Sequence, residues 1–351
     1  MNSNDIAKIA GVSRSTVSRV VNNYPNVPEA TRKKVEAVIE QYGYVPNTMG
    51  RGLVGMAPPI IGLFILDFFK EKDEEDTILC DSPILMEFAA LTSDMVKKWG
   101  YYVLVSVLQR EEELEEIRKL YRSNTIRGAI IMGDGIGEER MLSLAKEGCK
   151  LVVHNLMAHS THPNIIVVNN KNYEMAYQVT EQIIQDGHTR IAHITGDYKK
   201  LTVQERMRGM DECMQQHGLL FDPRYLGKGA YHRQHGGYQA MRQVLEQCEE
   251  VALPTALMAN SVMAVGALRA IKEVGLKVPE DISIYAIDGI EESKFTSPPL
   301  YEMCVSHRLI IETAVKAVIE AVEGKEHQRE YWLSPVGTNP GASVRVLSKN
   351  A

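Results

Sequence analysis

The feature that most restricts the fold of this chain is an alternation, beyond residue 59, of short apolar segments with longer amphipathic ones. Short apolar runs are typical of buried strands, and the segments between them have helical periodicity. Strands separated by helices predict a parallel α/β sheet. The predicted strands are 60–66, 101–107, 129–132, 151–154, 191–195, 255–259 and 283–287, and the predicted helices include 173–185, 205–216 and 262–274.

These strands fall into two series along the chain, which indicates two lobes. A chain of 351 residues is also too long for one ordinary compact core. Ligands of open α/β sheets bind beyond the carboxyl ends of the strands. We therefore expect a cleft between the lobes to be a ligand site.

The charge of the chain is unevenly distributed. Residues 1–55 contain seven Lys/Arg and four Asp/Glu, a net charge of +3, whereas the whole chain carries −6, so the remainder carries −9. Basic surfaces attract nucleic acid. This distribution predicts a small basic module joined to a large acidic body.

The start of the chain has the signals of two short helices joined by a tight turn. Asn2, with Asp5 three residues later, can cap a first helix that Gly11 ends. Ser13 can cap a second helix that begins at Arg14, so the turn has three residues. This spacing predicts a helix-turn-helix.

Hydrophobic periodicity predicts that a third helix, 29–42, closes a small core with these two. Its apolar residues recur at i, i+3, i+4 and i+7, and the second helix has an apolar face opposite a polar one. The predicted core positions on these two helices are Val17, Val20, Val21, Val35, Val38, Ile39 and Tyr42.

Residues 5–22 (DIAKIAGVSRSTVSRVVN) and 43–47 (GYVPN) resemble the DNA-binding domain of the lactose/galactose repressor family. Eighteen consecutive residues match in register, so the resemblance is specific. It implies that the second helix enters the major groove of double-stranded operator DNA. It also implies a homodimer that binds a pseudo-palindromic operator.

The resemblance assigns DNA-contacting roles to individual residues. Arg14 and Ser15 occupy the main base-reading positions, although Ser15 can also face the groove without touching a base. Arg19 reads a base further along, where a fork to guanine O6 and N7 gives roughly 1–3 kcal/mol of discrimination. Positions expected to contact phosphate or sugar are Thr16, Asn22, Thr31 and Tyr44.

Residues 47–54, beginning at Asn47, resemble the family's hinge helix, which orders only when paired with its dimer mate on DNA. Leu53 matches the leucine inserted into the minor groove, where an apolar wedge kinks the duplex. Gly50 and Gly52 stand where alanine and serine are usual, and each glycine costs about 1 kcal/mol in a helix. This hinge helix is therefore expected to be harder to order than is typical of the family. The alternative is that the segment is only a flexible linker.

The body is similar to the periplasmic-binding-protein-like domain of the same family, with markers at 186–194, 278–284 and 297–300. The similarity implies that the chain crosses between lobes near 169, 300 and 325. The predicted domains are a helix-turn-helix at 1–46, a hinge at 47–58 and an effector-binding and dimerisation domain at 59–351, with an N-lobe of about 59–168 and 301–325 and a C-lobe of about 169–300 and 326–351.

Four polar residues match effector-contacting positions of the family. Arg206 and Asp288 suit vicinal hydroxyls or a polar ring edge, and Asn260 adds a donor and an acceptor. The alternative for each of these three residues is a structural salt bridge or a helix cap. His232 matches a stacked aromatic ring, with an exposed loop histidine as its alternative. The resemblance also places Ser82 and Ile84 at the pocket.

Several departures from the family pattern bear on the effector. Ser261 and Asn169 replace aspartates, so a charge is lost at each position. Ile84 and Leu85 replace aromatic residues, which favours a roomier or less stacking pocket wall. An insertion with the charged run 70–76 is expected to be a solvated loop, with a lid or partner contact as the alternative. Family frequency favours a carbohydrate or glycoside over a purine.

No sequence signal supports an enzyme, a cofactor or a metal site. The glycine-rich segment 133–137 has the wrong spacing for a phosphate loop, and His154, His159 and His162 lack metal-site spacing. Five scattered cysteines are typical of reduced packing residues. Without a signal peptide or membrane-spanning run, we expect a cytoplasmic protein that contacts no membrane.

We therefore predict an allosteric repressor in which effector binding alters the pairing of two hinges on operator DNA. The main rival is a solute-binding protein for transport, because the body alone fits one, and the second rival is a sugar-acting enzyme. The DNA-binding module and the lack of a signal peptide argue against the first rival, and product analysis after incubation with candidate glycosides tests the second. Residues 344–351 contain no leucine heptads, so we expect a dimer and not a tetramer.

Overall fold

The computed structural model describes residues 1–21, 24–44, 59–66, 82–133, 138–156, 162–198, 200–229, 233–248 and 252–347. The chain divides into two units, Met1–Pro58 and Pro59–Ala351, each with its own hydrophobic core. The predicted hinge at 47–58 and the charged run at 70–76 lie outside the described residues.

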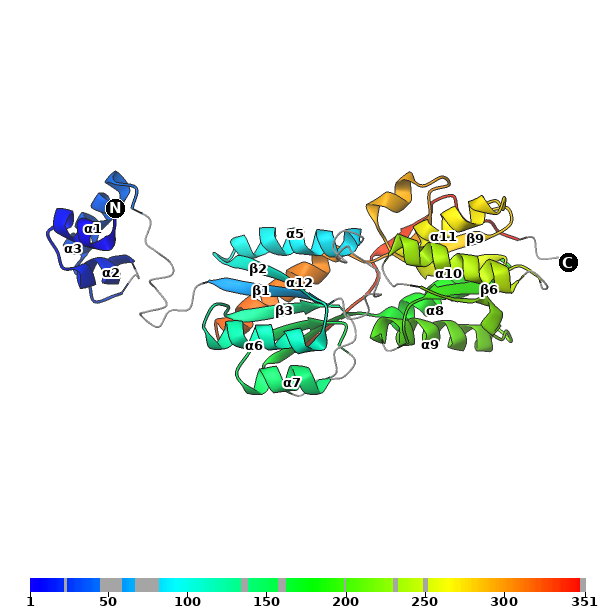
Figure 1. Cartoon of the computed structure of the whole chain (residues 1–351), viewed down its shortest axis with the longest axis horizontal. Coiled ribbons are helices and arrows are strands. Elements are labelled where there is room, and N and C mark those ends of the chain that lie inside the picture. Colours follow the sequence, from blue (N-terminus) through cyan, green and yellow to red (C-terminus); the bar gives the residue numbers. More distant parts are fainter. Residues whose placement is uncertain are drawn as a thin grey trace. The chain divides into compact units, whose positions relative to one another are not determined.

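The first unit is the predicted helix-turn-helix followed by a third helix (Figure 1). The Asn2 side chain caps the first helix, and the Asp5 carboxylate accepts the Asn2 amide in return. Gly11 ends that helix with φ 60°, and Ser13 Oγ accepts the Thr16 amide at 3.1 Å. The helices are α1 (Ser3–Ala10), α2 (Arg14–Val21) and α3 (Glu29–Gln41), so the predicted helix-turn-helix is confirmed.

Apolar side chains of all three helices form the core of this unit. The prediction for Tyr42 was wrong, because this residue ends α3 and is 45% exposed. Gly43 follows with φ 59° and turns the chain, so Tyr44 packs against the core instead. The buried core residues are Ile6, Ala7, Ala10, Val17, Val20, Val27 and Val35.

The second unit contains two lobes, each with a six-stranded sheet between layers of helices (Figure 1). The N-lobe sheet is parallel throughout, in the order β11-β5-β4-β3-β1-β2. Successive residues of β1 point to opposite faces, so Leu63 and Ile65 join the core beneath α5 and α12, whereas Phe64 and Leu66 join the core beneath α6 and α7.

The N-lobe elements follow one another along the chain with a final return near its end. They are β1 (Ile60–Leu66), α5 (Pro83–Lys97), β2 (Tyr102–Leu108), the 3-10 turn η2 (Glu111–Glu113), α6 (Leu114–Arg122), β3 (Gly128–Met132), α7 (Glu138–Lys146), β4 (Leu151–His154), β5 (Ile165–Asn170), α12 (His307–Val322) and β11 (Glu330–Leu333).

The C-lobe sheet has the order β12-β10-β9-β8-β6-β7, and β12 alone is antiparallel to its neighbour. Helices α10 and α11 cover one face, and α8 and α9 cover the other. The elements are α8 (Asn172–Gln185), β6 (Ile191–Thr195), α9 (Leu201–Gln216), η3 (Pro223–Tyr225), β7 (Leu226–Lys228), α10 (Gln234–Gln247), β8 (Ala256–Asn260), α11 (Ser261–Glu273), β9 (Ser283–Asp288), η4 (Glu291–Phe295), β10 (Tyr301–Cys304) and β12 (Gly337–Asn339).

The chain crosses between the lobes three times, but two predicted lobe limits were wrong. Residues 301–304 form β10, which pairs with β9 and so belongs to the C-lobe. Residues 330–333 form β11, which pairs with β5 and so belongs to the N-lobe. The crossings follow β5, β10 and β11, because each of these strands belongs to one sheet and the next helix or strand of the chain belongs to the other lobe.

The predicted α/β fold is confirmed, and every strand and helix expected in the body is present within four residues of its predicted bounds. Strands β5, β7, β10, β11 and β12 were not predicted. Among the described residues, no helix combines the length and apolar character needed to cross a bilayer.

Candidate functional site

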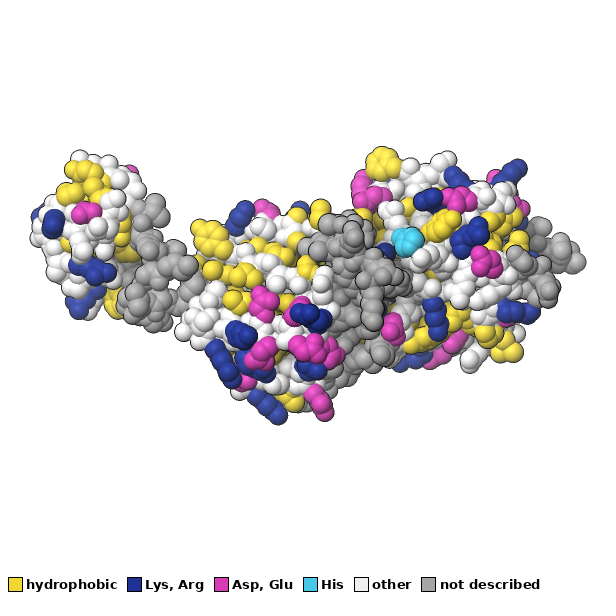
Figure 2. Space-filling model, in the orientation of Figure 1, with side chains coloured by type: hydrophobic (Ala, Val, Ile, Leu, Met, Phe, Trp, Pro, Cys, Tyr) yellow, Lys and Arg dark blue, Asp and Glu magenta, His cyan; other side chains and the backbone are white. Residues whose placement is uncertain are grey.

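The predicted base-reading residues lie on the exposed face of α2. Arg14, Ser15 and Arg19 are exposed, whereas Val17 and Val20 on the other side of the helix are buried. On the visible face of this unit, Lys and Arg side chains (dark blue) cover more area than Asp and Glu side chains (magenta) (Figure 2). The unit therefore presents two guanidinium groups from one short helix on a basic surface.

Hydroxyl groups at the start of α2 bond to one another. Ser13 Oγ lies 2.7 Å from Ser15 Oγ and 2.8 Å from Thr16 Oγ1. Arg14 Nε donates a hydrogen bond to Ser3 Oγ at 3.3 Å. A hydroxyl has one donor and two acceptor positions, so Ser15 and Thr16 keep bonding capacity toward DNA while their rotamers are held by Ser13.

The predicted phosphate contacts are placed less uniformly. Thr31 is half-buried in the first turn of α3, and the ring of Tyr44 packs against the three-helix core. Tyr44 thus has a structural role whether or not its hydroxyl meets DNA. Three predicted DNA-binding residues lie outside the described residues: Asn22, Asn47 and Leu53.

The second unit contains a cleft bordered by both lobes, at the carboxyl ends of their strands. It encloses about 690 Å³ of empty space, open solvent at the mouth included. The N-lobe contributes an apolar wall and several polar side chains, and the C-lobe contributes charged ones. The lining comprises Leu66, Ile84, Leu85, Phe88, Met132, Gly133, His154, Asn155, Asn170, Asn172, Lys200, Thr202, Arg206, Asp288, Val305, His307 and Ile310.

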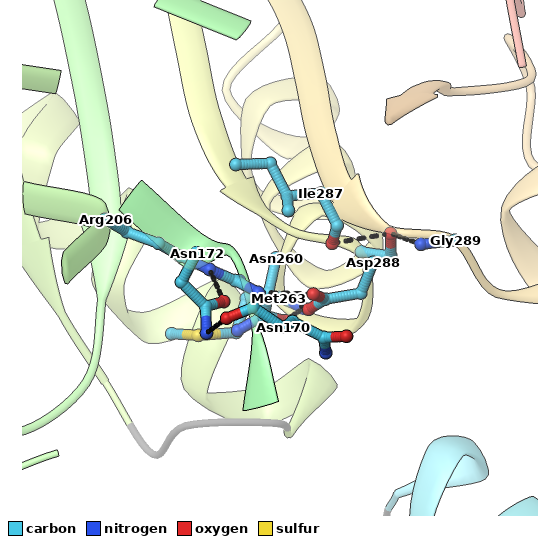
Figure 3. A network of polar contacts seen from close by, with 9 residues as sticks. Asn170, Asn172, Arg206, Asn260, Met263, Ile287, Asp288 and Gly289 are labelled. Carbon is cyan, nitrogen blue, oxygen red and sulfur yellow. Dashed lines mark hydrogen bonds and ion pairs between the residues drawn. The ribbon is translucent and has the colours of Figure 1, made fainter. Parts of the chain in front are cut away.

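Arg206 of α9 and Asp288 at the end of β9 form a buried ion pair on this lining (Figure 3). Each residue is 5% exposed. Arg206 Nη1 donates to Asp288 Oδ2 at 3.2 Å, and Nη2 donates to Oδ1. Because a bidentate guanidinium-carboxylate pair has fixed geometry, these two groups present a rigid polar surface to the cleft.

Asp288 has a backbone conformation that few non-glycine residues adopt, with φ 107°. Ser261 bridges the peptide groups on either side of it: its Oγ donates to the Ile287 carbonyl at 3.0 Å and accepts the Gly289 amide at 3.0 Å. The Asp288 carbonyl in turn accepts the Val305 amide at 2.9 Å. These bonds hold the carboxylate where Arg206 meets it.

The ion pair is connected to the first interlobe crossing by two asparagines. Arg206 Nε donates to Asn172 Oδ1 at 3.1 Å, and Asn172 Nδ2 donates to the Asn170 carbonyl at 3.3 Å (Figure 3). Because Val305 stands at the second crossing, the pair is bonded to two of the three segments that join the lobes.

Of the six predicted effector contacts, the structure places Arg206, Asp288 and Ile84 on the lining of the cleft. Asn260 is not on this lining, because its side chain caps α11 by accepting the Met263 amide at 2.9 Å. Ser82 is fully buried at the start of α5 and also lies off the lining. The sixth residue, His232, lies outside the described residues.

The polar residues that the N-lobe contributes to the lining were not predicted from the sequence. The lining atoms His154 Nε2, Asn155 Oδ1 and Asn170 Oδ1 are buried and have no hydrogen-bond partner among the described residues. Burial lowers the pKa of His154 to about 4, so this imidazole is neutral near pH 7. Polar residues just after buried strands were the available signal, as for His154 at the end of β4 and Asn170 at the end of β5.

Phe88 and two histidines form a compact group on the N-lobe wall. The rings of His154 and His307 lie edge-on to Phe88, with centroids 6.1 and 5.3 Å away. His307 Nδ1 lies 2.7 Å from Glu87 Oε2, and this hydrogen bond lowers the pKa of the Glu87 carboxyl. Phe88 is thus enclosed by neighbouring rings.

Asn169, one of the two positions where an aspartate was expected, is also structural. Its Oδ1 accepts the Asn155 amide at 2.8 Å, and its Nδ2 donates to the Leu156 carbonyl at 3.3 Å. The side chain therefore shapes the loop after β4, where Asn155 has φ 63°. Within the described parts of the chain, no group of three or more His, Cys, Asp or Glu side chains is placed to hold a metal ion.

Two family models match this chain. Residues 4–47 match the model described as bacterial regulatory proteins, lacI family, and residues 180–344 match a periplasmic binding protein-like domain. The HTH-type transcriptional repressor PurR of Aliivibrio fischeri (strain MJ11) is 30% identical over 329 residues, which are 93% of each chain. PurR of Haemophilus influenzae (strain PittEE) is 28% identical over 348 residues, 99% of this chain and 98% of its own.

Solved structures with the same architecture cover nearly the whole chain. The Lac repressor bound to ONPG in the repressed state superposes with a TM-score of 0.80 at 25% identity, covering 98% of this chain and 99% of its own. The regulator CelR in complex with cellobiose superposes with a TM-score of 0.71 at 22% identity, covering 98% of this chain and 99% of its own. The second comparison supports the fold alone.

Proposed function

The chain belongs to the lacI family of bacterial regulatory proteins, and on this basis we propose that it is a transcriptional repressor controlled by a small molecule bound in its cleft. Membership confirms the resemblance predicted from residues 5–22, and the family consists of transcription regulators and not of enzymes. The observation that carries the proposal for the effector is the buried Arg206–Asp288 pair on the lining of the cleft.

We expect Arg14 and Arg19 to read bases in the major groove, because both are exposed on one face of α2. Ser15 and Thr16 lie between them and retain bonding capacity, and Thr31 can reach the phosphate backbone from the start of α3. The hinge with Asn47 and Leu53 remains a prediction, as do the contacts of Asn22 and Tyr44.

Selection of binding sites from random duplexes tests the DNA half of the proposal. The full-length protein is expected to select an inverted repeat. Arg19→Ala should weaken binding about 5- to 150-fold at one base position, the loss of a 1–3 kcal/mol contact. Lys33→Ala, on the exposed face of α3, should leave the selected sequence unchanged. Binding without any sequence preference contradicts the proposal.

The lining of the cleft favours a carbohydrate or glycoside as the effector. Arg206 and Asp288 offer a donor and an acceptor side by side, which vicinal hydroxyls match. A purine binds best with an open aromatic face to stack on. Within the described lining the one phenyl ring is Phe88, and His154 and His307 lie against it.

We propose that effector binding changes the relation of the two lobes through the crossings. A ligand on the Arg206–Asp288 pair competes for groups that are bonded, through Asn172 and the Asp288 carbonyl, to the first and second crossings. A change at the pair is therefore transmitted to both crossings, and coupling between effector and operator must be reciprocal.

Thermal unfolding of the full chain tests the effector site. We expect a saccharide from the set glucose, galactose, cellobiose and maltose to raise the Tm, and guanine and hypoxanthine not to do so. A ligand at 100 times its Kd stabilises by about 2.7 kcal/mol. The shift should vanish in Arg206→Met and persist in Arg208→Met, an exposed arginine on the same helix. A shift that survives Arg206→Met contradicts this site.

We further propose a homodimer whose contacts include the free edge of the N-lobe sheet. Strand β2 lies at the end of the N-lobe sheet order. Tyr102 and Val105 of this strand are exposed, Tyr102 by 63%, and Met86 of α5 is exposed as well. Reading an inverted repeat also requires two copies. Sedimentation should show a dimer that Tyr102→Glu weakens and that Leu220→Glu, at an exposed C-lobe position, leaves intact.

A further inference from the structure

The two arginines on the exposed face of α2 differ in how their side chains are held. Arg14 Nε donates a hydrogen bond to Ser3 Oγ at 3.3 Å, across from α2 to α1. Within the described part of the chain, Arg14 makes no other side-chain hydrogen bond or ion pair, and the Arg19 side chain makes none. The direction of the Arg14 guanidinium therefore depends on a residue of another helix, whereas that of Arg19 does not.

The Ser3 hydroxyl is available for this contact because it is not needed to cap its own helix. Ser3 is the first residue of α1, and the Asn2 side chain before it accepts the amides of Asn4 and Asp5. The Asp5 carboxylate completes this capping box by accepting the Asn2 amide at 2.8 Å. Since α1 and α2 pack against each other (Figure 1), the Ser3 hydroxyl can act on α2 instead.

The bond to Ser3 leaves the DNA-binding capacity of Arg14 intact. A guanidinium has five N–H donors in a rigid planar fork. Because Ser3 accepts only the Nε–H, the terminal groups Nη1 and Nη2 keep their donors, and a fork of two such donors matches guanine O6 and N7. A distance of 3.3 Å is long for an N–H···O bond, so Ser3 orients the guanidinium and does not immobilise it.

Orientation before binding also reduces the cost of binding. A free arginine side chain loses much of its rotamer freedom when it is fixed against a base. The bond to Ser3 removes part of that freedom in advance, and binding then costs less conformational entropy. This saving applies to Arg14 and not to Arg19.

We infer that Ser3 is a positioning residue for base reading, which directs the terminal amino groups of Arg14 toward a guanine in the operator. The inference rests on the proposed DNA-binding function. It assigns part of the sequence preference to a hydroxyl of α1 that acts through Arg14.

Competition binding with full-length protein tests this role. The probe is the inverted repeat selected from random duplexes, together with versions in which each base pair is substituted in turn, at one fixed salt concentration because affinity for DNA depends on salt. Arg14→Ala and Arg19→Ala identify the base pair that each arginine reads. Ser3→Ala should then reduce discrimination about 3- to 10-fold at the Arg14 base pair, the loss of one hydrogen bond, and leave the Arg19 base pair unchanged.

Two matched variants separate positioning from other effects. Ser3→Thr keeps a hydroxyl and should retain the preference at the Arg14 base pair. In a protein that already carries Arg14→Ala, Ser3→Ala should have no further effect, because a positioning residue acts only through the residue that it positions. The Tm should not fall in Ser3→Ala, since Asn2 supplies the cap and alanine favours a helix.

Three results would overturn the role of Ser3 and leave the proposed DNA-binding function standing. An equal loss of affinity for every duplex in Ser3→Ala would show that the hydroxyl binds phosphate directly. A loss at both base pairs together with a lower Tm would show a structural role, and unchanged discrimination would show no role. If the unmodified protein selects no sequence at all, both the DNA-binding function and this inference fail.

Discussion

Removing one partner of the Arg206–Asp288 pair should destabilise the second unit far more than removing both. Each side chain is 5% exposed, so Asp288→Ala leaves a guanidinium buried without its carboxylate. Such a change costs about 3–5 kcal/mol, whereas apolar replacement of a whole buried pair is often nearly neutral. Arg206→Met with Asp288→Ala should therefore recover at least about 2 kcal/mol relative to Asp288→Ala alone.

Urea denaturation of the full chain at pH 7.5, followed by far-ultraviolet circular dichroism, measures these free energies. Glu273→Ala is the control, because its partner Arg269 is exposed and a surface pair contributes about 0–1 kcal/mol. If the two single substitutions add in the double variant, the residues do not act as a pair. A loss below about 1 kcal/mol in Asp288→Ala refutes the assigned burial and geometry.

Three further predictions concern other parts of the molecule. Ser261→Ala should lower the free energy of unfolding by about 1–2 kcal/mol, because the Ile287 carbonyl and the Gly289 amide each lose their hydrogen bond to the hydroxyl. Amide exchange should then quicken in the turn after β9. Burial lowers the pKa of His154 and of His193 to about 4, so the unfolded chain binds more protons below about pH 6.5. Stability should fall as the pH drops from 6.5 to 4, and a flat Tm over this range contradicts it. Tyr44→Ala should lower the Tm of the first unit, because the Tyr44 ring packs on its core. Tyr42→Ala should hardly change this Tm, because Tyr42 is exposed.

Local signals were sufficient to predict most of the fold. The caps at Asn2 and Ser13 and the stop at Gly11 act within one helical turn, and each is present as predicted. Long apolar runs such as 60–66 can only be buried strands in this context. Strand β12, by contrast, has the sequence Gly-Thr-Asn and owes its conformation to pairing with β10, so no local pattern predicts it.

The sequence was sufficient to predict those residues of the candidate site that are charged and stand at family positions. Arg206 and Asp288 were selected as charged residues at family positions, and both line the cleft. The asparagines were missed because amides are common and their role depends on which strand ends meet. Ser261 was read as the loss of a charge, whereas its hydroxyl bridges the turn that carries Asp288. Tertiary contacts determine such roles, and the sequence does not display them.

The late return of the chain to both lobes has a consequence for biosynthesis. The N-lobe sheet is incomplete until β11 pairs with β5, and the C-lobe sheet is incomplete until β12 pairs with β10. The first unit has all of its described core by Tyr44. On the ribosome, the DNA-reading module can therefore fold long before the sensor that governs it. A nascent or prematurely terminated chain has the module without its control, and it exposes an unpaired edge of β5 to other chains.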